Sequence, residues 1–109
     1  MQHLYGEFTQ NQIIQTKESL RRSIFFLLLC VDYKTSHEYK DVDVNKCFKG
    51  LLLRLGGLNQ LLMNQPELVT VMSLLQSAMN EYNNPEFNFK TYRKLILDAG
   101  AEVYKLKEV

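Results

Sequence analysis

The sequence predicts an all-α protein, a compact bundle of helices. Apolar side chains recur three and four positions apart over long stretches, which is the period of a helix buried on one face. Proline, glycine and polar clusters separate these stretches, and no alternating pattern of strand length lies between them. We expect four main helices at about 10–31, 44–55, 66–82 and 88–107, with a short extra helix at about 58–64.

The length predicts a single helical domain over 1–109. A chain of 109 residues buries roughly 60–70% of its unfolded surface, which is enough for a core without disulfides or metals. With five glycines and two prolines, little of the chain is suited to a linker. We expect residues 1–8 to form a flexible or extended arm.

The first helix has a clear start signal in the segment FTQNQI. Thr9 suits the N-cap position, with Gln12 as its capping-box partner, and Phe8 and Ile13 suit a hydrophobic staple. The helix then enters the run IFFLLLCV, which spans about 12 Å of helix at 1.5 Å per residue. A membrane-spanning helix needs about 20 apolar residues. We therefore expect no membrane anchor here, and a polar-rich segment before the run argues against a secretory signal.

The second helix should begin at Asp43, an N-cap residue after a polar loop. Apolar residues continue to Leu55 at helical spacing, where Gly56 and Gly57 follow. Because glycine leaves helical geometry at little cost, we expect the pair to end this helix before the short extra one.

The two prolines of the chain predict the starts of the third and fourth helices. Pro66 and Pro85 are each followed by glutamate, which the positive end of a helix dipole favours. The fourth helix has the most regular register in the chain. Its seam consists of Phe89, Tyr92, Ile96, Ala99, Val103 and Leu106.

Gly100 is unusual within this fourth helix. A glycine in a helix interior costs ~1 kcal/mol relative to alanine. We expect it to be tolerated because a neighbouring helix packs closely against it.

Composition and charge favour a protein of the cytoplasm. The net charge of +1 is not that of a typical nucleic-acid binder. The two cysteines, Cys30 and Cys47, both lie in apolar surroundings and suit buried thiols in a reducing compartment; a single disulfide is the alternative.

No motif in the sequence predicts a catalytic, cofactor or metal site. Asp41, Asp43 and Asn45 match the start of an EF-hand calcium loop, but the required glycine and final glutamate are missing. The histidines and cysteines lack paired zinc spacing. Cys30 lies within an apolar run that would keep its thiol protonated. We therefore expect no enzyme and no cofactor.

One basic cluster could serve nucleic acid. The Gly56–Gly57 break resembles the turn of a helix-turn-helix, but no lysine or arginine occurs between Arg54 and Lys90. Lys90, Arg93 and Lys94 form a basic patch at the start of the fourth helix. It is either a solvated face with the pairs Glu86–Lys90 and Lys94–Asp98, or a site for an acidic partner or phosphate.

The first helix carries more apolar surface than one core-facing stripe requires. Ile24, Leu27, Leu28 and Val31 supply that stripe, which leaves Phe25, Phe26 and Leu29 as a candidate protein interface. These three are covered within the chain, by a second copy, or by another protein. The favoured function is a small non-enzymatic interaction protein that binds another protein or itself as a homodimer; the alternative is a nucleic-acid-associated protein that uses the basic patch.

Overall fold

The computed structural model confirms the all-α bundle. It describes residues 2–3, 6–7, 10–61 and 65–106. Within them, two short strands, β1 (Gln2–His3) and β2 (Gly6–Glu7), pair antiparallel in the predicted N-terminal arm. The helices are α1 (Gln10–Leu29), the 3₁₀ helix η1 (Ser36–Glu38), α2 (Val44–Leu61), α3 (Pro66–Tyr82) and α4 (Phe89–Val103).

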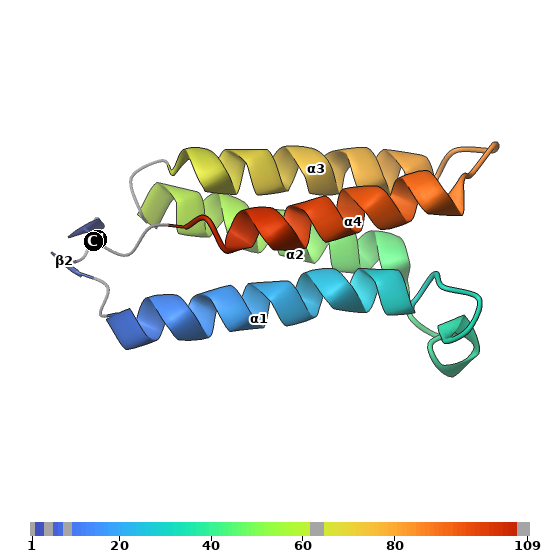
Figure 1. Ribbon diagram of the computed structural model, residues 1–109, viewed down its shortest axis with the longest axis horizontal. Coiled ribbons are helices and arrows are strands. Elements are labelled where there is room, and N and C mark those ends of the chain that lie inside the picture. Colours follow the sequence, from blue (N-terminus) through green and yellow to red (C-terminus); the bar gives the residue numbers. More distant parts are fainter. Residues whose placement is uncertain (1, 4–5, 8–9, 62–64, 107–109) are drawn as a thin grey trace.

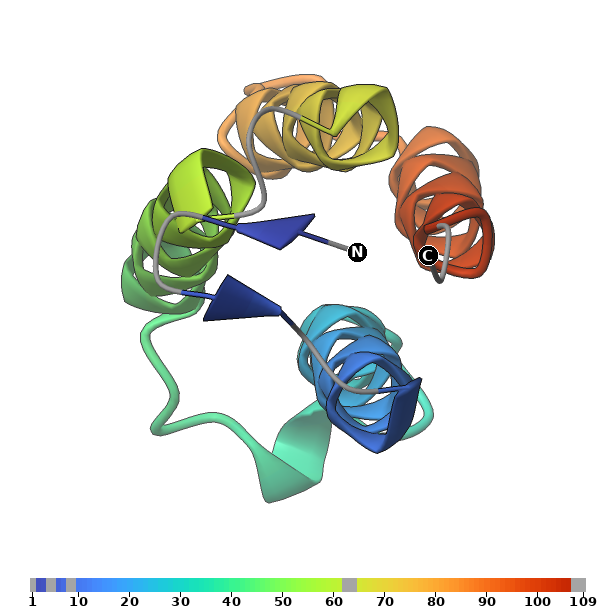
Figure 2. The same ribbon diagram turned by 90° about the vertical axis from the view of Figure 1, so that its left-hand side faces the viewer.

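The four long helices run alternately up and down in an elongated bundle (Figure 1) measuring 43 × 23 × 21 Å. Seen end-on, they follow one another around a ring in the order α1, α4, α3, α2 (Figure 2). α4 therefore lies between α1 and α3 and packs against both, whereas α1 and α2 touch only sparsely. Each helix faces the shared core with one apolar stripe. The largest side chains fully buried there are Tyr92, Phe48, Leu20, Ile24, Leu27, Leu55, Leu68, Leu75 and Ile96.

α1 begins at the predicted residue and ends two residues earlier than predicted, at Leu29. The N-cap predicted at Thr9 and the staple between Phe8 and Ile13 involve side chains outside the described ones. The last turn accounts for the helix end, because each of its final four carbonyls accepts a hydrogen bond. The Phe26 carbonyl accepts from Cys30 N–H, and the Leu27 carbonyl accepts from the Tyr92 hydroxyl. The Leu28 carbonyl accepts from the N–H groups of Val31 and Asp32. The Leu29 carbonyl accepts from the Thr35 hydroxyl.

The bond from Tyr92 joins α4 to α1 inside the core. Val31 turns its N–H to Leu28, so the Leu27 carbonyl lacks its usual helical donor. The hydroxyl of the fully buried Tyr92 supplies one at 2.7 Å. Its ring meets the edge of Phe48 from α2 at 6.2 Å between centroids and lies 6.3 Å from the ring of Tyr82 of α3, so a single side chain contacts the three other long helices.

α2 corrects the prediction of a break at Gly56 and Gly57. The helix begins after Asp43, whose carboxylate accepts from Lys46 N–H at 3.1 Å as predicted, and then continues through both glycines. There is thus no separate helix beginning at residue 58, and residues 62–64 lie outside the described ones. The physical reason is the buried stripe, which runs unbroken across the glycines through Val44, Phe48, Leu51, Leu55 and Asn59.

α3 matches its predicted span, with Pro66 in the first turn. α4 is shorter than predicted at both ends, and Pro85 lies in the preceding turn rather than in the helix. Asn88 caps α4 instead, because its side-chain oxygen accepts from Thr91 N–H at 3.2 Å. Beyond Val103 the chain tightens into hydrogen bonds of the 3₁₀ type. The predicted seam is confirmed, with Phe89 partly buried and the other five members buried.

We predict that Gly57→Ala raises the free energy of unfolding by about 0.5–1 kcal/mol, because alanine lowers the entropy cost of a continuous helix. The structure offers room, since a Cβ at Gly57 meets no atom within 4 Å. Urea unfolding measures the change, and Gly56→Ala provides a second reading. A loss of stability in both variants would show that the chain needs glycine geometry at this point.

We predict that Tyr92→Phe lowers the free energy of unfolding by about 1–3 kcal/mol, because the buried Leu27 carbonyl loses its donor. Tyr33→Phe is the control, since Tyr33 is largely exposed.

Burial, with a smaller effect from Cys30 and Tyr82, raises the pKa of Tyr92 above its ordinary value of 10.0. The folded chain then keeps a proton that the unfolded chain releases, so stability falls as the pH rises above about 10. Tyr92→Phe should have a shallower alkaline slope than the wild type; equal slopes would contradict this assignment.

Candidate functional site

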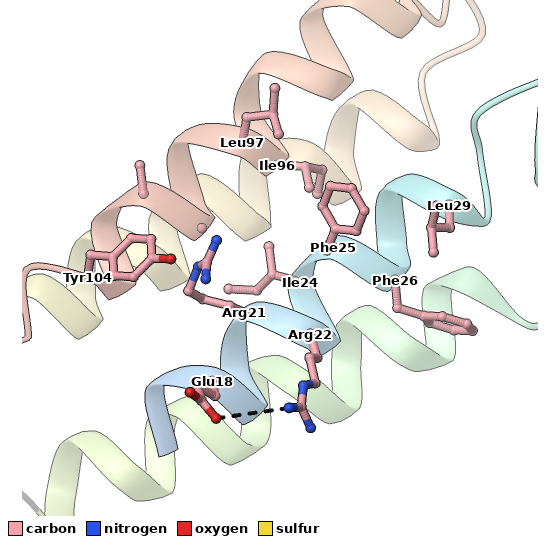
Figure 3. Close-up of a pocket in the computed structure, with 12 residues that line it drawn as sticks. Glu18, Arg21, Arg22, Ile24, Phe25, Phe26, Leu29, Ile96, Leu97 and Tyr104 are labelled. Atoms are coloured by element: carbon pink, nitrogen blue, oxygen red, sulfur yellow. Dashed lines mark ion pairs between the residues drawn. The ribbon is translucent and has the colours of Figure 1, made fainter. Parts of the chain in front are cut away.

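A groove of about 850 Å³ lies between α1 and α4 (Figure 3). At one end its walls are apolar, formed by Phe25, Phe26 and Leu29 of α1 and Ile96 and Leu97 of α4. The candidate protein interface predicted from the sequence therefore lines this groove.

The structure gives the three predicted interface residues different surroundings. Phe25 is 50% exposed, as expected for a side chain that the core does not cover. Phe26 packs against the core, and its ring meets the edge of Tyr39 at 5.2 Å between centroids. Leu29 is half-buried near the end of α1. Phe25 is thus the most accessible of the three.

Small residues on α4 keep the groove deep. Gly100 and Ala101 lie one turn after Leu97 and line the groove. A Cβ built on Gly100 meets no atom within 4 Å. The expectation of close helix packing at Gly100 was therefore wrong. Its missing side chain leaves space on the groove side, whereas the neighbouring Ala99 is the residue buried in the core.

The other end of the groove is cationic. Arg21 extends from α1 toward α4 (Figure 3), and its guanidinium carbon lies 4.0 Å from the ring centroid of Tyr104. Its Nε is buried without a hydrogen-bond partner among the described residues. Arg22 is mostly exposed and lies 3.9 Å from Glu18, a long and solvent-screened contact.

Of the predicted basic patch, Arg93 lies on the groove side of α4. Arg93, Leu97, Gly100 and Tyr104 recur at helical spacing, so Arg93 extends the groove-facing stripe by one turn toward the helix start. Lys94 forms the predicted pair with Asp98, at 3.3 Å. The predicted pair of Lys90 with Glu86 is absent among the described residues, because Glu86 lies in the turn before the helix.

The two cysteines lie outside the lining of the groove. The described residues hold no group of three or more side chains suited to a metal ion. Cys30 and Cys47 are free thiols, and burial, with Cys47 nearby, raises the pKa of Cys30. A thiol with a raised pKa is a weak nucleophile near neutral pH.

Sequence reasoning missed the α4 wall of this groove. The signal was present in the stripe of Arg93, Leu97, Gly100 and Tyr104 along α4. This stripe lies beside the core seam of the same helix. It becomes a groove wall only because α4 packs against α1, which the sequence alone does not show.

Comparison with protein families, with curated proteins and with solved structures finds no match to this chain. Among the described residues, no helix is both long enough and apolar enough to cross a membrane.

We predict that Phe25→Ala costs less than about 1 kcal/mol of unfolding free energy, because half of this side chain is already in water. Leu27 is fully buried in the core, so Leu27→Ala should lower the free energy of unfolding by about 2–5 kcal/mol. Chemical denaturation of both variants measures the difference. Equal costs would mean that Phe25 is covered in solution.

Proposed function

We propose that this protein is a non-enzymatic interaction module whose α1–α4 groove binds a short amphipathic helix of another protein. The observation that carries the proposal is the gathering of three exposed large side chains, Phe25, Leu97 and Tyr104, around one groove. Isolated exposed apolar residues are ordinary, whereas a contiguous apolar hollow marks a binding surface.

The shape of the groove favours a helix as the ligand. Two antiparallel helices form its walls, and a third helix laid between them presents anchors every three or four residues. Gly100 and Ala101 leave room for a bulky anchor between Phe25 and Tyr104. Such a ligand would bury the surplus apolar surface of α1 and act by occupancy, without chemistry.

Charge argues against a second copy of the chain as the occupant. Two cations, Arg21 and Arg22, line the groove against one carboxylate, Glu18, and Arg93 continues the stripe of α4 that faces it. Two such faces would bring like charges together, which is costly at an interface. Self-association through this groove is therefore the alternative to binding another protein, and the oligomeric state of the groove variants distinguishes the two.

Nucleic acid is the less favoured ligand, because phosphate binding gains nothing from Phe25 and Leu97 at the centre of the surface.

A reducing compartment such as the cytoplasm suits the two free thiols, Cys30 and Cys47.

We predict that a displayed library of amphipathic helices, selected on the purified protein, yields binders that need the groove. Leu97→Glu should weaken them by roughly thirtyfold or more, because it places a charge among the apolar anchors. Leu53→Glu is the matched control, since Leu53 is an exposed leucine on α2 outside the groove. Binding of each enriched peptide is measured by fluorescence anisotropy.

Two results would overturn the proposal. Enriched peptides that bind both variants equally would place the binding surface elsewhere. A dimer in light scattering that Leu97→Glu dissociates and Leu53→Glu preserves would assign the groove to a second copy.

A further inference from the structure

We infer that the helix bound by the α1–α4 groove is acidic at both ends and apolar in its middle. This inference rests on the proposed function and adds the chemistry of the partner. It starts from the order of side chains along the groove, which runs from the arginines of α1 to apolar residues. Beyond these, the stripe of α4 continues by one turn to Arg93.

Arg21 is prepared to receive a carboxylate. Its guanidinium stacks on Tyr104 at 4.0 Å and has no ion pair or hydrogen bond among the described residues. Stacking on a ring occupies the face of a guanidinium and leaves its in-plane N–H groups for an acceptor. A side chain already held in this way loses less entropy when it binds. Arg22 adds a second cation beside it, and its ion pair within the described part of the chain is the long contact with Glu18.

Arg93 supplies the opposite end. It lies one turn before Leu97 on the groove stripe of α4, and Lys90 lies about one turn further toward the helix start. Both are exposed, and neither has an ion pair among the described residues. These positions begin α4, where the helix dipole adds positive potential and would further favour an anion.

The spacing of the two ends sets the register of the partner. Arg93 and Tyr104, which carries Arg21, are separated by about three helical turns, or roughly 16 Å along α4. A bound helix would match them with carboxylates about three turns apart on one face. Two apolar side chains between these carboxylates would meet Phe25, Leu97 and the space at Gly100.

The test compares three synthetic helical peptides of about four turns. The first has two glutamates about three turns apart, with two leucines between them on the same face. In the second, glutamines replace the glutamates. The third has the composition of the first, with the glutamates moved to the opposite face. Affinities are measured by fluorescence anisotropy on the full chain at low and high salt.

The first peptide should bind about tenfold more tightly than either control, since each end adds charge-assisted hydrogen bonds. The advantage should shrink at high salt. Arg21→Met and Arg93→Gln should each remove part of it, with the apolar stem of Arg21 largely retained. Lys49→Gln on α2, a charge change outside the groove, should leave it intact.

Equal binding of the three peptides, lost in Leu97→Glu, would overturn the acidic partner while the groove remained a helix-binding site. No binding by any peptide, or binding unaffected by Leu97→Glu, would overturn both. A DNA duplex that bound at low salt in their place, and failed with Arg93→Gln, would assign the cations to phosphate.

Discussion

The hydrogen bond from the Tyr92 hydroxyl to the Leu27 carbonyl fixes how α4 lies against α1. A carbonyl in the last turn of a helix has no partner within that helix, and a buried one must find a donor from elsewhere. Tyr92 supplies it from α4, with its side chain turned into the core. The contact therefore sets the register of α4, and with it which residues of α4 face α1 at the surface.

The groove follows from this register. With Tyr92, Ile96, Ala99 and Val103 turned into the core, the adjacent stripe of the same helix lies beside α1 at the surface. At the far end of the two helices, Arg21 stacks on Tyr104, and Lys17 donates to the Tyr104 carbonyl at 3.4 Å. Contacts inside the core and at the surface thus hold both walls, so the hollow between them is part of a packed structure.

The sequence predicts the helices well where burial and local chemistry agree. The Asp43 cap and the seam of α4 are visible in it because both depend on residues close along the chain. Gly56 and Gly57 mislead because a local cost, about 1 kcal/mol each, competes with a buried stripe that continues on both sides. Phe25 is recognisable as surplus, but its partner surface is not, since no local pattern tells that α4 packs against α1 more extensively than α2 does.

Gly100 is a position where the depth of the groove can change without changing the packing of the core. Its missing side chain opens toward the groove and not toward the core, so residues of increasing size there would make the hollow shallower without crowding the bundle interior. Most positions that shape a binding surface also contribute to packing, and changes at them exchange affinity against stability. At Gly100 a larger residue would not crowd the core, and a change to alanine would itself favour the helix by about 1 kcal/mol, so groove depth and core packing can be altered separately.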